Sequence, residues 1–272
     1  MTLRPPLYFK TEGPKDAPCI ILLHGFLGSH KDWEPYTKHL KRNYFIIRPD
    51  LPGHGKSLIK NIGITFDTVA DQLREIFIKL GITNAFWVGY SMGGRIALFT
   101  ATKYPTLFRK LLLESSGPGI INARERVLRR KTDALWAHKL RTMNTKNFIS
   151  LWYSSPLFSS LAKNPKRLRT LMEKRKVQNR NELSKVLIRL GAGAQKPLWK
   201  KLRSLPFPIW VLAGKRDVKY VKISTDMKKY CRVIHVSQIP DTGHNIHFEN
   251  YYGFTRELDS FLKTSEGPSS LK

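Results

Sequence analysis

Cysteine and long apolar runs are both scarce in this chain of 272 residues. The two cysteines, Cys19 and Cys231, exclude a disulfide framework and a four-cysteine zinc site, and their apolar neighbours favour buried free thiols in a reducing compartment. No apolar run approaches the length of about 18 residues that a membrane-spanning helix needs. The N-terminal segment contains Pro5, Pro6 and Pro14 and no apolar stretch typical of export signals. We therefore expect a cytoplasmic protein with no transmembrane segment.

Acidic residues are few relative to basic ones. The chain has 20 Asp and Glu against 48 Lys and Arg, which gives a formal net charge of +28. This balance predicts attraction to anionic substrates, anionic membranes or nucleic acid, while the alternative is a set of lysines scattered over a solvated surface. Hydrophobic residues make up 41% of the chain, so it is too apolar to be disordered. Its length suits one large domain or two small ones.

Short apolar runs alternate with helix-like stretches in the first half of the chain, a rhythm typical of βαβ units and a parallel sheet. Continuous runs such as Ile20–Leu23 fit strands buried on both faces, and the last third of the chain resumes the rhythm. We predict an α/β fold with a mostly parallel sheet and helices on both faces. The predicted strands are Cys19–Leu23, Tyr44–Arg48, Ala85–Gly89, Lys110–Glu114, Ile209–Leu212 and Arg232–Val236, and the predicted helices are Lys31–Lys41, Phe66–Leu80, Met92–Lys103, Ile223–Tyr230 and His247–Leu262.

Residues 119–203 differ from the rest because they are predicted to form helices without strands, among them Ala123–Leu140 and Leu168–Lys176. This stretch holds 22 Lys and Arg against 4 Asp and Glu, and so carries most of the net charge. A helical insertion between two halves of a parallel sheet covers the carboxyl ends of the strands, where open α/β sheets bind ligands. We expect a core from residues 1–118 and 204–263, a helical cap from residues 119–203, and a disordered tail from residues 264–272.

A glycine-flanked serine follows one of the predicted strands. Gly89-Tyr90-Ser91-Met92-Gly93 matches the pattern G-x-S-x-G, and it lies between a predicted strand and a predicted helix, as that pattern requires. The glycines permit a sharp turn that would expose Ser91 at the top of the sheet. The alternative is a structural serine in a turn. The context favours a nucleophile or base at Ser91.

An acid and a histidine should follow the serine in the order Ser, Asp, His. Asp217 and His244 each follow a predicted strand, so both are expected at the edge of the sheet where Ser91 lies. Asp217 would orient the imidazole of His244, which in turn would activate Ser91. Asp241 is a rival acid, expected instead to brace the turn beside the histidine. No metal-ligand cluster or phosphate-binding loop accompanies these residues, so we expect no cofactor.

The loop after the first buried strand begins His24-Gly25-Phe26. In folds of this kind the loop donates one backbone N–H to an oxyanion hole, and the residue after the nucleophile donates the other. This predicts Phe26 and Met92 as oxyanion donors. His24 is expected to brace the loop, and His247 to be a surface or helix-packing residue.

Four segments of the chain, LHGFLGSHKDW, DLPGHGKS, GYSMGGR and TGHNIHFEN, together resemble the α/β-hydrolase superfamily. The resemblance covers residues 18–262. More narrowly the chain resembles the MenH family, the 2-succinyl-6-hydroxy-2,4-cyclohexadiene-1-carboxylate synthases of menaquinone biosynthesis. The residues that carry the narrower resemblance are Arg95, Trp152-Tyr153-x-x-Pro156, Arg175, Gly214-x-Arg216-Asp217 and Gly243-His244-Asn245-x-His247.

The resemblance implies a lyase that eliminates pyruvate from 2-succinyl-5-enolpyruvyl-6-hydroxy-3-cyclohexene-1-carboxylate, with the serine acting as a base. A serine hydrolase acting on an ester, thioester or carbon–carbon bond of an acidic molecule would use the same triad and is the alternative. A third interpretation, a nucleic-acid- or membrane-binding protein that retains a hydrolase fold, has only the charge to support it. We expect no specific nucleic-acid partner because no basic stripe carries interleaved stacking aromatics.

The substrate of the MenH family carries three carboxylates, so the resemblance implies several cations in the pocket. Arg95 lies one helical turn after Ser91 and on the same face. Arg129 and Arg175 resemble the second and third arginines of the family, and a planar guanidinium can grip a carboxylate at two points. Tyr90 and Trp152 resemble residues that contact the substrate. The alternatives are an exposed helical position for Arg95, different members of the basic clusters around Arg129 and Arg175, and a cap-core position for Trp152.

Overall fold

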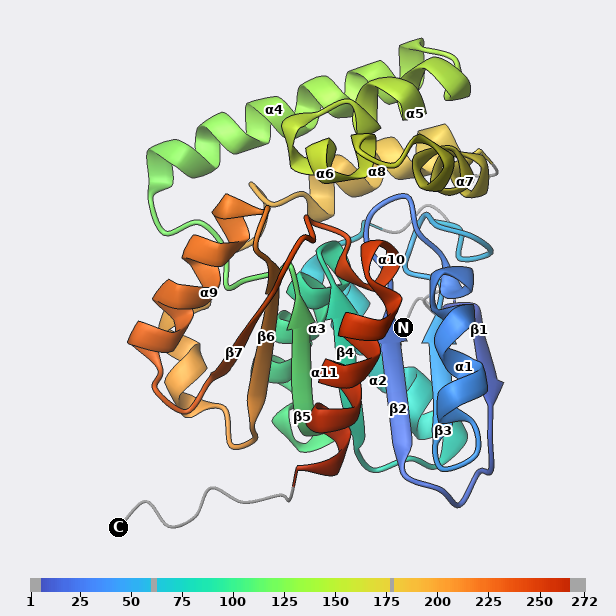
Figure 1. Cartoon of the computed structure of the whole chain (residues 1–272), viewed down its shortest axis with the longest axis vertical. Helices are drawn as coiled ribbons and strands as arrows, with labels where there is room; N and C mark the ends of the chain where they lie inside the picture. The colour runs from blue at the N-terminus through green and yellow to red at the C-terminus, as the bar shows by residue number, and fades with distance from the viewer. Residues whose placement is uncertain (1–5, 60–62, 177–178, 265–272) are drawn as a thin grey trace.

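A seven-stranded sheet forms the centre of the protein (Figure 1). The computed structural model describes residues 6–59, 63–176 and 179–264. The strand order is β1-β3-β2-β4-β5-β6-β7; β1 pairs antiparallel with β3, and every other pairing is parallel. The strands are β1 (Phe9–Glu12), β2 (Cys19–Leu23), β3 (Phe45–Pro49), β4 (Ala85–Tyr90), β5 (Phe108–Glu114), β6 (Ile209–Gly214) and β7 (His235–Ile239).

Helices cover both faces of this sheet because its central strands are apolar on both sides. On one face, α2 (Phe66–Leu80), α3 (Met92–Lys103) and α9 (Val218–Tyr230) share a core with residues such as Ile21 and Leu23. On the other face, α1 (Glu34–Leu40) and α11 (Tyr251–Lys263) pack on Ile20 and Leu22. Alternate residues of β2 thus enter opposite cores, as the two-residue period of a strand requires. The predicted fold class is confirmed.

A group of helices lies above the carboxyl ends of the strands (Figure 1). They are α4 (Ala123–Thr142), α5 (Thr145–Tyr153), α6 (Ser159–Ala162), α7 (Pro165–Arg175) and α8 (Arg180–Leu190). An asparagine side chain caps the N-terminus of four of them, Asn122, Asn144, Asn164 and Asn179. Their apolar side chains form a core of their own, in which Leu140, Phe148 and Leu183 are buried. The division of the chain at residues 119 and 203 stays a prediction.

The predicted elements at the edges of the sheet differ most from the structure. β1 was not predicted because its four residues are half-exposed and carry no apolar run. β7 begins three residues after the predicted Arg232, since an edge strand with exposed positions gives a weak signal. α9 begins at Val218 instead of Ile223 because the Asp217 side chain caps it. The predicted helix from His247 is two helices, α10 (Ile246–Glu249) and α11, that meet at Asn250.

The remaining expectations concern composition and the tail. Cys19 and Cys231 are buried free thiols. The predicted disordered tail lies outside the described residues apart from Thr264. Among the described residues, no helix combines the length and the apolar character needed to cross a bilayer, and no group of three or more His, Cys, Asp and Glu is placed to hold a metal ion.

Candidate active site

Ser91 lies at a sharp turn between β4 and α3. Its backbone has φ 48° and ψ −108°, a conformation that non-glycine residues rarely adopt. The Ser91 N–H donates to the Glu114 carbonyl at 2.8 Å, which fixes the turn to β5. A Cβ on Gly93 would lie 2.5 Å from the Leu23 carbonyl oxygen, and one on Gly89 would lie 2.6 Å from the Cα of Gly94. The glycines are therefore required for the close approach of α3 to the sheet.

The structure brings Ser91, His244 and Asp217 into one chain of hydrogen bonds. The Ser91 Oγ lies 3.0 Å from His244 Nε2, and His244 Nδ1 lies 2.7 Å from Asp217 Oδ2. The histidine and the aspartate are buried, while the serine is partly exposed. The other Asp217 oxygen accepts from the Tyr220 N–H, which locks the carboxylate at the start of α9. Asp241, the rival acid, is highly exposed and pairs with Arg216 instead.

The loop that carries His244 is held by a carboxylate that the sequence analysis did not single out. Glu249, on α10, accepts from the Gly243 N–H at 2.9 Å with Oε2 and from the Asn245 N–H at 3.1 Å with Oε1. One side chain thus binds the backbone on both sides of the histidine. Its signal in the sequence was a lone acid five residues after His244, which is too common a pattern to predict such a role.

His247 anchors the same loop from below. Its backbone N–H and its Nδ1 both donate to the buried Glu114 carboxylate, at 2.9 and 2.8 Å. Its carbonyl accepts from the Tyr36 hydroxyl, and its ring stacks on Trp33 with centroids 4.5 Å apart. The sequence allowed either a surface position or a helix-packing position for His247. Because His247 is buried, the packing position is confirmed and the surface position is wrong.

The expected oxyanion donors flank Ser91. Phe26 and Met92 both line the pocket beside it. Met92 is the first residue of α3, so its N–H has no acceptor within the helix. His24 braces the neighbouring loop: its Nδ1 donates to the Gly25 carbonyl at 2.8 Å, and its Nε2 accepts from the Leu51 N–H at 2.9 Å.

A second buried histidine braces the same loop. His54 Nε2 accepts from the Leu27 N–H at 3.2 Å, and its Nδ1 donates to the Pro52 carbonyl at 3.0 Å. The contact with the Leu27 N–H requires a neutral ring, because Nε2 can accept only when it carries no proton. Burial, the largest cause, and the neighbouring His24 lower the pKa of His54 to about 3, and burial also lowers the pKa of His24. Both rings are therefore neutral near neutral pH.

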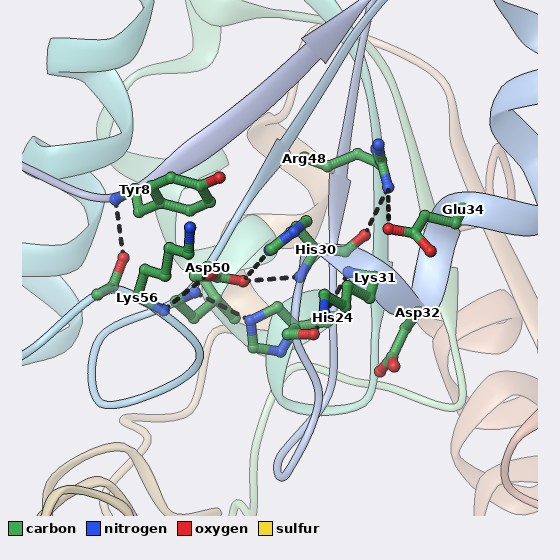
Figure 2. A network of polar contacts seen from close by, with 12 residues as sticks. Tyr8, His24, His30, Lys31, Asp32, Glu34, Arg48, Asp50 and Lys56 are labelled. Atoms are coloured by element: carbon green, nitrogen blue, oxygen red, sulfur yellow. Dashed lines mark hydrogen bonds and ion pairs between the residues drawn. The ribbon is translucent and has the colours of Figure 1, made fainter. Parts of the chain in front are cut away.

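Asp50 joins the loop that follows β2 to the loop that follows β3, as Figure 2 shows. Its Oδ1 accepts from the backbone N–H and the Nδ1 of His30, at 2.7 and 2.8 Å, and its Oδ2 accepts from the Lys56 N–H at 2.9 Å. Arg48 donates to the His30 carbonyl from the neighbouring strand. This buried network fixes the loop that carries Phe26 to the end of β3.

A pocket with about 660 Å³ of empty space, its open mouth included, lies between the sheet and the cap. Ser91 and His244 line its floor, and Tyr90 is buried beside them with its ring centroid 5.5 Å from that of His244. Trp152 and Phe158 line the cap side. Trp152 also packs on Phe26 and on Trp136, at 5.0 Å between centroids in both cases, so it is both a pocket wall and part of the cap core.

Arg95 lines this pocket and is 9% exposed, so the alternative of a solvent-exposed helical position is wrong. Its Nη1 donates to the Leu190 carbonyl of α8 at 2.8 Å. No carboxylate of the described residues lies within ion-pair distance of its guanidinium. Burial lowers the pKa of Arg95 to about 10, so it remains a cation at neutral pH. A buried cation without a protein carboxylate suits an anionic ligand.

Arg129 and Arg175 lie in different surroundings. Arg129 lines the pocket, and its Nε donates to Asp133 at 2.8 Å on the same helix. Arg175 does not line the pocket: it is 3% exposed, its Nη1 lies 2.6 Å from Asp32, and its Nε donates to the Tyr153 hydroxyl. The expected placement of Arg175 against the substrate is therefore corrected, because its charge is neutralised in a buried pair that joins the cap to the core.

Lys219 is a pocket cation that the sequence analysis missed. It lies in the first turn of α9, two residues after Asp217, and it lines both this pocket and an adjoining one. It is exposed, and no carboxylate among residues 6–59, 63–176 and 179–264 lies within 4.0 Å of its ammonium. Many lysines in this chain look alike in sequence, so only the fold could distinguish this one.

Comparison with known proteins agrees with this architecture. Residues 18–251 match the family model of the alpha/beta hydrolase fold, so the chain belongs to the α/β-hydrolase family. It is 32% identical over 251 residues to the 2-succinyl-6-hydroxy-2,4-cyclohexadiene-1-carboxylate synthase of Escherichia coli O1:K1, covering 92% of this chain and 96% of that protein. The Shigella boydii protein of the same name is equally similar.

Solved structures give the same assignment. MenH from S. aureus superposes with a TM-score of 0.89 at 30% identity, covering 94% of this chain and 97% of that one. Within the hydrolase family, the chain therefore belongs to the MenH group. A thermophilic esterase from Thermogutta terrifontis has a TM-score of 0.78 at 23% identity over 94% of this chain and 92% of that one, a likeness of fold alone.

Proposed function

We propose that this protein is a lyase that eliminates pyruvate from 2-succinyl-5-enolpyruvyl-6-hydroxy-3-cyclohexene-1-carboxylate, giving 2-succinyl-6-hydroxy-2,4-cyclohexadiene-1-carboxylate in menaquinone biosynthesis. The relatives at 32% and 30% identity carry this name or the family name MenH. The observation that carries the proposal is the position of Arg95, a buried cation without a protein carboxylate, in the pocket of Ser91. A pocket for neutral esters has no use for such a charge.

The reaction begins with removal of the proton on the ring carbon next to the succinyl ketone. Ser91 Oγ takes this proton as its own hydroxyl proton passes to His244 Nε2, 3.0 Å away. A free hydroxyl is a poor base, so the imidazole and Asp217 must make it one. Asp217 holds Nδ1 of the ring at 2.7 Å and stabilises the imidazolium that forms.

The electrons of the broken C–H bond pass first to the ketone oxygen and give an enolate. The backbone N–H groups of Phe26 and Met92 stabilise this oxygen, since an oxyanion hole serves an enolate as well as a tetrahedral intermediate. When the enolate collapses, the ring double bond shifts, the ring C–O bond breaks, and pyruvate leaves as its enolate. His244 gives its proton to this enolate, which becomes pyruvate, and the triad returns to its starting state.

The three carboxylates of the substrate need cations in the pocket. Arg95 supplies a guanidinium that no carboxylate of the described residues neutralises, and Arg129 supplies one shared with Asp133. Lys219 supplies an exposed ammonium that lines two adjoining pockets. Tyr90 and Trp152 line the same pocket as these cations and the triad. Arg175 acts indirectly, by holding the cap against the loop of Asp32. No metal or organic cofactor takes part in this scheme.

We also propose that residues 119–203 form the substrate-covering cap and that the protein acts in the cytoplasm. Buried thiols suit a reducing compartment, and burial raises the pKa of Cys19 to about 12, which keeps it unreactive.

A direct assay tests the proposal. The purified protein is given the enolpyruvyl substrate, and pyruvate is followed with a coupled dehydrogenase while a neutral ester is followed by absorbance on the same preparation. We expect pyruvate release with little or no ester cleavage. Efficient ester cleavage without pyruvate release would favour the serine hydrolase instead.

A further inference from the structure

The outermost helix of the cap presents a face that the proposed reaction does not use. α4 runs along the top of the molecule in Figure 1. Its buried residues include Ala137 and Leu140, which pack into the cap core. Because an α-helix repeats every 3.6 residues, Leu128 and Leu135 lie on the opposite side and face solvent.

Three aliphatic side chains are exposed on this helix. Val127, Leu128 and Leu135 expose 51, 62 and 64% of their surface, whereas Ile121, which precedes the helix, lines the pocket that adjoins the active site. The other large hydrophobic residues with comparable exposure, among those described, are distributed over other segments. Clustered exposure of aliphatic groups to water is unfavourable, and it marks surfaces that bind something.

Cations are interleaved with these aliphatic residues. Arg124, Lys131, Lys139 and Arg141 are exposed, and no carboxylate of the described chain lies within 4.0 Å of any of them. The only acids of α4 are Glu125 and Asp133, and Asp133 is buried against Arg129. We refer to the three aliphatic residues and these four cations as the outer face of α4.

The chemistry of this face distinguishes its possible occupants. A second copy would bring like charges together, which is repulsive. Nucleic acid binding uses successive aromatic side chains to stack bases, whereas the partly exposed Trp136 beside this face is already covered by the ammonium of Lys139. Protein interfaces depend on Trp, Tyr and Arg anchors in well-packed pockets, whereas leucines spaced along one helix with lysines between them offer no pocket. A basic helix with exposed leucines is typical of segments that lie on an anionic bilayer.

We propose that the outer face of α4 docks the protein reversibly on anionic membrane surfaces. Leu128 and Leu135 enter the boundary between headgroups and acyl chains, and the cations around them bind lipid phosphates. The apolar inner face of α4 is already used by the cap, so few groups enter the bilayer and the attraction is largely electrostatic. Docking is therefore weak and salt-sensitive. This inference does not depend on the reaction proposed above.

The test is co-sedimentation of the intact protein with vesicles of phosphatidylcholine, with and without phosphatidylglycerol, over a series of salt concentrations. We expect binding only to the anionic vesicles and release at high salt. Replacing Arg124, Lys131 and Lys139 together by Gln should weaken binding on the order of a hundredfold, since each cation contributes about fivefold. Leu128→Gln with Leu135→Gln should weaken it about tenfold.

Matched variants distinguish the effect of the outer face of α4 on vesicle binding from the effect of the total charge of the protein. Lys15, Lys38 and Lys41 are exposed on other elements, so replacing these three by Gln changes the net charge equally, and Ile78→Gln removes an aliphatic group of equal exposure on α2. The proposal requires that both controls bind vesicles like the wild type. Equal loss in the control and face variants, equal binding to neutral vesicles, or binding to an oligonucleotide but not to vesicles would each overturn it.

Discussion

The two walls of the pocket are built by different means. On the core side, Ser91, Asp217 and His244 lie at strand ends where backbone hydrogen bonds fix each of them. On the cap side, Arg129 and Trp152 project from α4 and α5, whose apolar side chains share a cluster with the other cap helices and with Leu27 and Phe248 of the core. Among the described residues, the two pocket cations without a carboxylate partner, Arg95 and Lys219, lie on the core helices α3 and α9, whereas Arg129 of the cap pairs with Asp133. Residues 119–203 nevertheless hold most of the net charge of the chain. In the proposed reaction the strand ends perform the chemistry, and Arg95, Lys219 and the cap select an anionic substrate.

The largest expected effect lies on the core side. Ser91→Ala should lower kcat for pyruvate release by about 10⁴-fold or more, because it removes the base on which the other triad residues act. Thermal unfolding of the variant should match the wild type, since within the described part of the chain the Ser91 hydroxyl makes a hydrogen bond only with His244. Rates near those of the wild type in folded protein would show that the triad is not the site of chemistry.

Arg95 tests the selective side of the comparison. Arg95→Ala should lower kcat/KM for pyruvate release by roughly 10- to 150-fold. This range corresponds to the loss of a hydrogen bond to a charged group, which contributes about 1.5–3 kcal/mol. Arg95→Lys should recover part of the loss, since an ammonium keeps the charge but not the planar fork. Any cleavage of a neutral ester should be unchanged. A parallel fall in both activities would mean that Arg95 supports the fold through Leu190 rather than the substrate.

Glu249 tests whether the core wall needs its precise backbone anchoring. Glu249→Ala should lower kcat on the order of tenfold with KM unchanged, because a loosened loop misplaces His244 relative to Ser91. Glu249→Gln keeps an acceptor for one of the two N–H groups and should recover much of the rate. The measurement is a full kinetic profile over pH for both variants. A rise in KM without a change in kcat would assign Glu249 to substrate binding instead.

Lys219 should give a smaller effect because its ammonium is exposed and screened by solvent. Lys219→Gln should raise KM by about two- to fivefold and leave kcat unchanged. Lys222 lies one turn further along α9 and is paired with Asp226, so Lys222→Gln is the matched control and should leave KM unchanged. Salt should diminish the difference between Lys219→Gln and the wild type. Equal KM values for Lys219→Gln and Lys222→Gln would show that Lys219 does not bind the substrate.

The neutral histidines under the oxyanion loop predict a dependence of stability on pH. An unfolded histidine titrates near pH 6.5, whereas the pKa of His54 in the folded protein is about 3, so the unfolded state binds the proton first. The free energy of unfolding should therefore fall as the pH drops from 6.5 toward 3, by about 1.4 kcal/mol per pH unit for this group. Denaturant titrations at a series of pH values give the free energy of unfolding, which should depend less steeply on pH in His54→Gln than in the wild type. An equal dependence on pH in the two proteins would refute the neutral buried ring.

The parts of the structure that could be predicted from the sequence are those that depend on local patterns. β2 and α2 match their predicted bounds because a continuous apolar run and a clear helical period are local signals. Ser91, Asp217 and His244 were predicted from short patterns at strand ends, and the structure brings them together. Glu249, Lys219 and the pairing of Arg175 with Asp32 were not, because they depend on contacts between distant segments.

In the proposed reaction, Ser91 acts as a base toward carbon rather than as a nucleophile. The most direct test compares the enolpyruvyl substrate carrying deuterium on the ring carbon next to the succinyl ketone with the unlabelled compound, under conditions where chemistry limits the rate. We expect a primary isotope effect on kcat/KM for pyruvate release and no mass adduct on Ser91 in quenched enzyme. The absence of an isotope effect, together with a covalent substrate fragment on Ser91, would contradict it.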